Sequence, residues 1–488
     1  MAKYIGITIG PIHDTMMLSS KPAALWGASF LFSYLGKELC VRLQKTYGEQ
    51  CQVIVPYVDF EAKDESVNYL LKMQEGVGLI HDRIIAVMNC DGTEEEIVTE
   101  VNQKVIEPVR LNLTEKILAD IKEGGQDAKN ELKDYFQIYA VCMELAEGTE
   151  IVPAVSGVLD VLELEKQFIP ESTQDFLHRF LENEILKESF LVKDIDRAKW
   201  QLMRQDKKIK TIEDIAGKKT YFALVQADGD GMGKVLCSLK TSKQVKDFSE
   251  KCIRYSAKAS EVIGKHGGVT VYAGGDDLLF LAPVEKEKIN ILSLIRELRT
   301  VFATEFSEPE YAECNVSYGV QIVYEKFPLY EAFDMASGLL FGKAKEKRNS
   351  CAIAVQKHSG QSVEFVLHDF SDKDGASSNP ITEQLVSLIE AKCGKDFLKS
   401  ASKHIMEQKE AFKVAMENKC IGILMENLFD NNMQKKYSND IEKVKEIFES
   451  TIKGNISYHD DAELAVLALL RYADFYSGGG EKNHVTQN

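Results

Sequence analysis

The residues of this chain that could do chemistry are aspartates beside glycine-rich turns. In the stretch VTVYAGGDDLLFLAP, residues 269–283, two apolar runs flank Gly274, Gly275, Asp276 and Asp277. Taken alone, Gly-Gly-Asp-Asp is a good hairpin turn with a solvated tip, because glycine adopts the backbone conformations of tight turns. Two adjacent carboxylates are also suitable ligands for metal ions. The stretch by itself does not decide between a hairpin tip and a metal site.

A second acidic turn precedes this one in the chain. The apolar stretch YFALVQAD, residues 221–228, reads as a strand and ends at Asp228. One predicted helix and one predicted strand separate it from GGDD. In a β-α-β-β unit the first strand and the later hairpin lie side by side. We therefore expect Asp228 to meet Asp276 and Asp277 at one edge of a sheet.

Carboxylates that converge in this way repel each other unless a cation neutralises them. Mg²⁺ is a hard ion that binds carboxylate and phosphate oxygens and keeps some of its waters. Two such ions can stabilise both the attacking and the leaving oxygen of a phosphoryl transfer. The two acidic turns together therefore predict a Mg²⁺ site, with Mn²⁺ as the alternative ion, formed by Asp228, Asp276 and Asp277.

The elements that must position these aspartates form two similar β-α-β-β patterns. The helix of the second pattern begins at Thr241, which fits a capping box with Gln244. The strands and helix of the first pattern are 3–12, 51–60, 82–89 and 22–48, and those of the second are 221–228, 269–273, 278–283 and 241–268. We also expect helices at about 94–149, 171–205, 286–305 and 329–347, strands at 313–324, 351–358 and 363–370, and only helices from about 380 onward.

These patterns predict an α+β fold with two ferredoxin-like domains that carry helical insertions, followed by an all-helical C-terminal domain. A polar and basic stretch, DKKIKTIEDIAGKKT, separates the two ferredoxin-like patterns. We place the first domain at 1–210, the second at 211–378 and the helical domain at 379–488.

The composition limits the partners and the compartment. The formal net charge is −17, whereas proteins that grip a phosphate backbone by themselves usually have a basic surface. We therefore expect nucleic acid to be held mainly through partners. The ten cysteines include no C-x-x-C and no zinc-ligand spacing, so we expect no zinc and a reduced, cytoplasmic protein. The sequence has no signal peptide and no apolar run long enough to span a membrane, so we expect no membrane contact.

Two longer stretches, ALVQADGDGMGKVL and GGVTVYAGGDDLLFLAP, together resemble the second palm domain of the large signalling subunit of type III CRISPR effector complexes, particularly the Cmr branch. They are more distantly similar to GGDEF diguanylate cyclases and class III nucleotide cyclases. ITIGPIHD, ALWGASFLFSYL and GLIHDRIIAVM resemble the first palm domain of the same family. The resemblance implies a target-RNA-activated nucleotidyltransferase that converts ATP to a second messenger, a cyclic oligoadenylate. Its partners would be other subunits of the complex, guide RNA and target RNA.

The resemblance also implies roles for individual residues by matching position. Asp228, Asp276 and Asp277 would bind Mg²⁺ and be catalytic. Lys345 stands where the family has a phosphate-contacting lysine, although a solvated lysine at a helix end is the structural alternative. Ser317 would face the adenine. The residues implied to line the ATP phosphates are Gly229, Asp230, Gly231, Gly274 and Gly275. No protein nucleophile is needed, because a 3′-hydroxyl attacks the α-phosphate and pyrophosphate leaves.

The chain departs from the family pattern in its N-terminal part. Many relatives begin with an HD nuclease domain, but here the first palm strand begins at residue 3. We therefore expect no such domain and no DNase activity. Four His-Asp pairs, at 13–14, 81–82, 368–369 and 459–460, are scattered along the chain and are interpreted as coincidences. The four-cysteine zinc insert of the family is also missing.

Three alternatives stay open at this point. Some relatives without the nuclease domain join ATP to S-adenosylmethionine, and Asp59 is a carboxylate available to its amino group, although a solvated aspartate at a strand end is the simpler interpretation. A catalytically silent scaffold subunit is the second alternative. A free-standing cyclase that acts as a homodimer is the third, and it is disfavoured because two palm patterns already lie in one chain.

Overall fold

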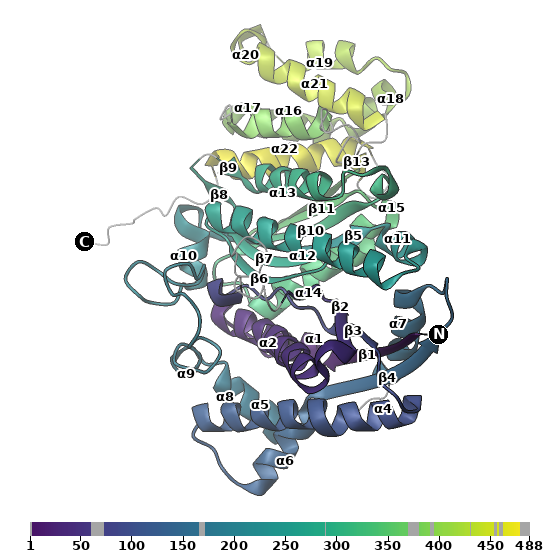
Figure 1. Ribbon diagram of the computed structural model, residues 1–488. Coiled ribbons are helices and arrows are strands. Elements are labelled where there is room, and N and C mark those ends of the chain that lie inside the picture. The colour runs from purple at the N-terminus through teal and green to yellow at the C-terminus, as the bar shows by residue number, and fades with distance from the viewer. Residues whose placement is uncertain are drawn as a thin grey trace, which may run out of the picture. The chain divides into compact units, whose positions relative to one another are not determined.

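The computed structural model describes residues 2–59, 73–164, 171–287, 289–368, 380–390, 395–429, 431–452, 456–457 and 462–478 (Figure 1). The chain folds into two compact units. The first unit contains Met1–Thr211, Gly231–Phe280 and Glu305–Cys314, and the second contains Ile212–Asp230, Leu281–Thr304 and Asn315–Asn488. The division into three domains at 210 and 378 stays a prediction.

A four-stranded antiparallel sheet lies in the first unit. Its strands follow the order β2-β3-β1-β4, and each neighbouring pair is antiparallel. This is the strand order of a ferredoxin-like β-α-β-β-α-β fold, which confirms the predicted fold class for the N-terminal part. The strands are β1 Ala2–Gly10, β2 Cys51–Val55, β3 Arg83–Met88 and β4 Gln137–Leu145.

The helix α2, Pro22–Tyr47, connects the first two strands of this sheet. Pro22 stands in its first turn, where the missing backbone N–H costs nothing. One face of this helix has buried side chains at three- and four-residue steps. These side chains are Leu25, Ser29, Phe32, Leu35, Leu39 and Leu43.

A seven-stranded sheet has the order β13-β12-β11-β10-β5-β7-β6. Its part β10-β5-β7-β6 repeats the order β4-β1-β3-β2 of the smaller sheet. The internal repeat that the sequence only suggested is therefore present in the topology. The strands are β5 Tyr221–Asp230, β6 Val269–Gly274, β7 Asp277–Pro283, β10 Asn315–Tyr324, β11 Cys351–Gln356, β12 Ser362–Leu367 and β13 Ile456–Ser457.

The helix α12, Ser242–Lys265, begins with the predicted capping box. The Thr241 hydroxyl accepts a hydrogen bond from the Gln244 N–H, and the Gln244 side chain accepts one from the Thr241 N–H. The short strands β8 Glu285–Lys286 and β9 Ile289–Asn290 form a separate two-stranded sheet. The other helices in this part of the chain are α10 Ile212–Ala216, η4 Gly217–Lys219, α11 Met232–Ser238, α13 Ile291–Glu305, η5 Pro309–Tyr311, α14 Leu329–Leu339, the π-helix η6 Leu340–Ala344 and α15 Lys345–Lys347.

The prediction of one long helical stretch at 94–149 was wrong at its C-terminal end. Residues Gln137–Leu145 form β4 at the edge of the smaller sheet. Its apolar run, residues 138–143, is a strand signal that the prediction of one long helical stretch overlooked, and only some of these side chains are buried. Much of 171–205 is also turn rather than helix. The helices of these regions and of the N-terminal part are α1 Ile12–Met17, η1 Gly48–Gln50, η2 Met73–Glu75, α4 Glu94–Val101, the π-helix η3 Asn102–Ile106, α5 Glu107–Asp120, α6 Gln126–Tyr135, α7 Ile151–Glu163, α8 Glu171–Phe180 and α9 Asn183–Leu186.

Among the described residues from 380 onward, the chain is helical apart from the short strand β13, which was not predicted and which pairs with β12 of the larger sheet. In Figure 1 its yellow-green helices lie beside one another, and α22 packs on both α17 and α21. No helix in the described parts of the chain has the length and apolarity that a membrane span requires. The helices are α16 Pro380–Glu390, α17 Lys395–Glu407, α18 Lys409–Glu417, α19 Ile421–Leu428, α20 Asn431–Lys436, α21 Ser438–Ile452 and α22 Ala462–Gly478.

Candidate functional site

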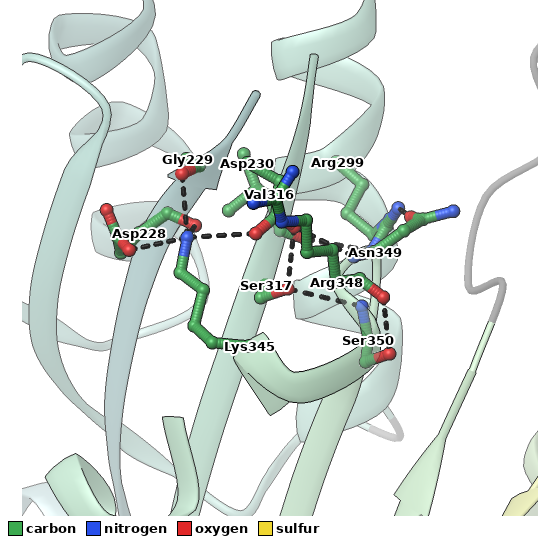
Figure 2. Close-up of polar contacts among 10 residues, drawn as sticks. All are labelled: Asp228, Gly229, Asp230, Arg299, Val316, Ser317, Lys345, Arg348, Asn349 and Ser350. Carbon is green, nitrogen blue, oxygen red and sulfur yellow. Dashed lines mark hydrogen bonds and ion pairs between the residues drawn. The ribbon is translucent and has the colours of Figure 1, made fainter. Parts of the chain in front are cut away.

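The Lys345 ammonium lies among four oxygen atoms at the end of β5 (Figure 2). It donates hydrogen bonds to the main-chain oxygens of Asp228 and Gly229, at 2.9 and 2.6 Å, and to Oδ1 of Asp230 at 2.9 Å. Oδ2 of Asp228 lies 2.5 Å from the same nitrogen. Lys345 is therefore not a solvated lysine at a helix end in this structure, because its side chain is only 18% exposed.

The geometry of β5 explains why one lysine reaches both aspartates. Side chains two residues apart on a strand point to the same face, so Asp228 and Asp230 face the same way. Ser317 of β10 stands opposite Asp228 in the strand register, and its hydroxyl donates a hydrogen bond to Oδ2 of Asp230 at 2.6 Å. Ser317 is fully buried, and its predicted contact with adenine stays a prediction.

Asp230 is the buried member of the aspartate pair. Its side chain is 2% exposed, compared with 28% for Asp228. A buried carboxylate must be paired or hydrogen-bonded to persist as an anion. Asp230 accepts from Lys345, from Ser317 and from the backbone N–H of Asn349 at 2.8 Å. Asp228 is thus the aspartate of the pair that is more accessible to a ligand.

The turn after α15 closes around Asp230. Arg348 and Asn349 both have positive φ angles, 59° and 44°, and Arg348 lies outside the left-handed helical region because its ψ is 175°. Asparagine tolerates this conformation better than most residues, whereas arginine adopts it rarely. The Arg299 guanidinium donates hydrogen bonds to the Val316 carbonyl, at 3.1 Å, and to Oδ1 of Asn349. The turn is therefore held from two sides, by Asp230 and by Arg299.

Close packing of a helix on β10 brings Lys345 to this place. A Cβ atom added at Gly319 would lie 2.4 Å from the Ala336 carbonyl oxygen and 2.6 Å from the Leu340 nitrogen. Real Cβ atoms do not approach backbone this closely, so only glycine fits at this point of the strand. The absence of a side chain lets α14 and η6 lie directly against β10, and Lys345 follows at the end of η6.

The GGDD hairpin belongs to the first compact unit. Gly274 ends β6 and Asp277 begins β7, as the sequence predicts. Gly275 has a φ of +69°, the left-handed region that favours glycine in a tight turn. Its carbonyl accepts a hydrogen bond from the Ser256 hydroxyl of α12 at 2.8 Å. Asp276 is half-buried, as is Asp277, so the hairpin is anchored to the helix below it rather than a freely solvated tip.

The surroundings of the hairpin are negative. Burial raises the pKa of the Tyr272 hydroxyl, and the charges of Asp277, Asp82 and Asp276 raise it further. Burial also raises the pKa of the Cys314 thiol to about 11, with Asp276 as the next cause. These shifts place several carboxylates within electrostatic reach of one another, which is a setting that attracts a cation.

The predicted metal ligands are divided between the two compact units. Asp228 belongs to the second unit, and Asp276 and Asp277 belong to the first. Among the residues that the structure describes, no group of three His, Cys, Asp or Glu side chains is placed to hold a metal ion. The carboxylates and the carbonyls around Lys345 are nevertheless hard oxygen donors of the kind that Mg²⁺ prefers. Their chemistry fits the ion, and the convergence of the three aspartates stays a prediction.

The other residues that the sequence analysis named lie in several different elements. Gly229 lies within β5, and Gly231 precedes α11 with a φ of 79°. The His13–Asp14 pair lies exposed on α1, and His81–Asp82 precedes β3. Of the other two His-Asp pairs, Asp369, His459 and Asp460 lie outside the described residues. Asp59 is half-buried after β2.

Sequence reasoning missed Arg299, Asn349 and Ser350. The Ser350 N–H donates to the Ser317 hydroxyl at 3.3 Å, and its own hydroxyl lies 3.0 Å from Nδ1 of His368. Asn349 carried a weak signal, since an asparagine just after a predicted helix favours a left-handed turn. Arg299 carried none, because it lies in a helix far along the chain from its partners.

Both predicted palm patterns match models of known protein families. Residues 221–352 match the model described as Cas10/Cmr2, second palm domain, and residues 4–115 match CRISPR-associated protein Cmr2, N-terminal. Together the two ranges cover half of the chain. A curated relative, the CRISPR system Cmr subunit Cmr2 of Pyrococcus furiosus, is 28% identical over 176 residues. That match covers 30% of this chain and only 20% of the relative's own length.

Solved structures with the same fold cover almost the whole chain. A type III-B Cmr-beta complex, determined by cryo-EM in the apo state, has a chain with a TM-score of 0.58 at 12% identity, covering 98% of this chain and 82% of that one. A Csm1-Csm4 cassette in complex with one ATP gives 0.56 at 13% identity, and one in complex with cA4 gives 0.53 at 14% identity. Both cover 98% of this chain and 70% of theirs. At these identities the likeness shows the fold.

Proposed function

Since the chain belongs to the Cas10/Cmr2 family, we propose that it is a nucleotidyltransferase that converts ATP to a second messenger within a type III CRISPR complex. The observation that carries this proposal is the Lys345 ammonium beside Asp228 at the end of β5, in a sheet of palm topology. A cation and a part-exposed carboxylate at one strand end suit a triphosphate with its metal ion.

Asp228, Asp276 and Asp277 would together hold Mg²⁺. The strand order supports this, because β7 is the neighbour of β5 and Asp277 begins β7 while Asp228 lies near the end of β5. When bound, the metal ion neutralises phosphate charge and lowers the pKa of an attacking hydroxyl. Lys345 would exchange its Asp228 contact for a phosphate oxygen when ATP binds, and Asp230 would keep the ammonium in reach.

The reaction forms one bond and breaks one. The oxygen of a 3′-hydroxyl bonds to the α-phosphorus of ATP, the bond from that phosphorus to the bridging oxygen breaks, and pyrophosphate leaves while the hydroxyl proton passes to water. Positive charge from Lys345 would stabilise the charge that develops on the phosphates. We propose a second ATP as the acceptor and a cyclic oligoadenylate as the product, because relatives of the same fold were solved with cA3, cA4 and pppApA.

The partners and the activating signal belong to the same proposal. We propose that the chain is a cytoplasmic subunit that contacts guide and target RNA mainly through other subunits, as suits its net charge of −17. The curated relative is a Cmr subunit, and chains of similar fold come from Cmr and Csm assemblies, which supports this proposal.

Product analysis of the assembled complex tests the proposal. The complex with guide RNA is incubated with labelled ATP, with or without target RNA, and products are identified by mass spectrometry. We expect pyrophosphate and cyclic oligoadenylates only when target RNA is present, and none from the double variant Asp276→Ala with Asp277→Ala. Full turnover by that variant would show that the site is assigned wrongly.

Further arms of the same experiment distinguish the alternatives. S-adenosylmethionine is added in one arm, and a product containing both ATP and this compound would replace the proposed acceptor. A complex that binds target RNA but consumes no ATP in any arm would indicate a scaffold subunit. Turnover by the purified chain without RNA would indicate a free-standing cyclase.

A further inference from the structure

We propose that Arg299 and Asn349 are positioning residues that hold the Lys345 ammonium beside Asp228. This inference rests on the proposed function for its catalytic consequence, but not for its structural part. Neither the sequence patterns nor the family resemblance assigned either residue a role. A continuous chain of contacts runs from Arg299 to Lys345 within the second compact unit (Figure 2).

The first step of this chain joins α13 to the turn after α15. Arg299 is 7% exposed, so its guanidinium is fixed by its partners rather than by solvent. It donates to the Val316 carbonyl of β10 at 3.1 Å and to the side-chain oxygen of Asn349. A guanidinium presents its donors in a rigid planar fork. Two of them therefore hold Asn349 at a fixed place relative to β10.

The second step joins the turn to the aspartate. The backbone N–H of Asn349 donates to Oδ2 of Asp230, which also accepts from the Ser317 hydroxyl. Oδ1 of the same carboxylate accepts from Lys345. One oxygen thus faces the turn and the other faces the lysine. The orientation of the Asp230 carboxylate, and with it the position of the ammonium, depends on where the turn holds Asn349.

The third step concerns the backbone of the turn. Arg348 and Asn349 have positive φ angles in succession, which residues with a side chain rarely adopt. Such a conformation persists only when its surroundings fix it. Lys345 lies on the same short segment, and the Arg348 N–H bonds to the carbonyl of Ala344 at 3.1 Å. Release of the turn from Arg299 should therefore loosen the segment that carries Lys345.

Chemical labelling of lysines tests the structural part without any nucleotide. The full chain is treated with an amine-reactive ester, and modification of Lys345 is measured by mass spectrometry relative to Lys343, which pairs with Glu364 instead. In Asn349→Gly, glycine keeps the left-handed turn but loses the oxygen that Arg299 binds. We expect labelling of Lys345 to rise about fivefold, as loss of one net hydrogen bond implies, while labelling of Lys343 stays unchanged.

Two further variants separate positioning from general instability. Asn349→Asp keeps an acceptor for Arg299, so its Lys345 should be labelled at nearly the wild-type rate. Arg299→Gln removes the guanidinium and should behave like Asn349→Gly. If Arg299→Gln fails to fold, Arg299→Lys is used as the variant that lacks the guanidinium. Unchanged Lys345 labelling in folded Asn349→Gly and folded Arg299→Gln would overturn the inference.

Kinetics of the complex with target RNA test the catalytic part. A lysine that stabilises charge developing on the phosphates acts more on the transition state than on ATP binding. We expect Asn349→Gly to lower kcat about tenfold with a smaller change in KM, and Asn349→Asp to restore kcat. Equal kcat values in wild type and Asn349→Gly would refute this part. If the wild-type complex releases no pyrophosphate, the proposed function fails, and the labelling result still decides the structural part.

Discussion

The ammonium of Lys345 lies 2.5 Å from the carboxylate of Asp228 and 2.9 Å from that of Asp230. The two aspartates share one face of β5, so their charges would repel each other without a cation between them. A single lysine from a helix end contacts both carboxylates and offsets part of their repulsion. Under the proposed function, the part-exposed Asp228 would release the ammonium to a nucleotide phosphate while the buried Asp230 retains it.

Removal of the Lys345 charge should impair catalysis strongly. In Lys345→Met the aliphatic stem is kept but the ammonium is lost, and we expect ATP turnover by the assembled complex to fall about 10²-fold, the effect of removing one charge-stabilising donor. The measurement is pyrophosphate release under saturating ATP.

The control for this variant is Lys343→Met, two residues earlier. Lys343 pairs with Glu364 on β12, so turnover should stay near the wild-type value. If Lys345→Met turned over ATP as fast as this control, Lys345 would have only a structural role.

Much of the fold follows from local patterns in the sequence. The continuous apolar run and the length of YFALVQAD predict β5, and the apolar runs around GGDD predict the hairpin at Gly275. Thr241 and Gln244 give the start of α12, because a capping box depends only on residues three apart. These predictions were confirmed because each rests on neighbours in the chain.

The features that sequence patterns did not reveal depend on contacts between distant residues. Arg299 and Asn349 are 50 residues apart, and Lys345 is 117 residues from Asp228. No periodicity or turn residue records such a pairing. The strand β4 was missed for another reason. Its apolar run, residues 138–143, lies within a long charged stretch that was interpreted as one helical region, and it pairs with β1.

Substitution of Gly319 by alanine should destabilise the second unit. The added Cβ would meet the backbone of Ala336 and Leu340, and backbone cannot move aside as a flexible side chain can. We expect the free energy of unfolding to fall by about 1–3 kcal/mol, as for other overpacked sites, and the labelling of Lys345 to increase. Thermal unfolding and the lysine labelling assay measure the two effects.

Gly338→Ala provides the matched control for this variant. Gly338 lies in α14 with no atom within 4 Å of its added Cβ, so alanine should stabilise the helix by about 0.5–1 kcal/mol. A lower Tm for Gly338→Ala than for Gly319→Ala would contradict the packing argument.

Turnover of ATP should require a divalent ion. The donors at the site are carboxylates and carbonyls, which bind Mg²⁺ or Mn²⁺ and have little affinity for soft ions. We expect EDTA to abolish pyrophosphate release and added Mg²⁺ or Mn²⁺ to restore it. Asp228→Asn should raise the Mg²⁺ concentration that gives half-maximal rate. Undiminished turnover in EDTA would exclude the proposed mechanism.

An ion-pair cluster at the C-terminal end of α13 should make stability depend on pH. The side chain of Glu305 is only 5% exposed, and its carboxylate contacts Nε of Arg254 at 2.6 Å and the ammonium of Lys258. Burial alone would raise the pKa of Glu305, but the hydrogen bonds from Lys258 and Arg254 outweigh it and hold the pKa below its ordinary value of 4.5. A carboxylate whose pKa is lowered by folding stabilises the folded state above the unfolded pKa, and this contribution is lost as the pH falls through the folded pKa.

Glu305→Gln should therefore lower the Tm at neutral pH, and the difference from wild type should shrink as the pH falls below 4.5. We expect the substitution to lower the free energy of unfolding by about 1–2 kcal/mol at neutral pH. The loss is small because Arg254 and Lys258 are part-exposed and regain water in the variant. Thermal unfolding of both proteins across this pH range gives the difference directly. The exposed Glu95 of α4 serves as a control, since Glu95→Gln should change the Tm little at any pH. A Glu305→Gln difference that stays constant through the acidic range would show that packing, rather than the ion pairs, accounts for the loss.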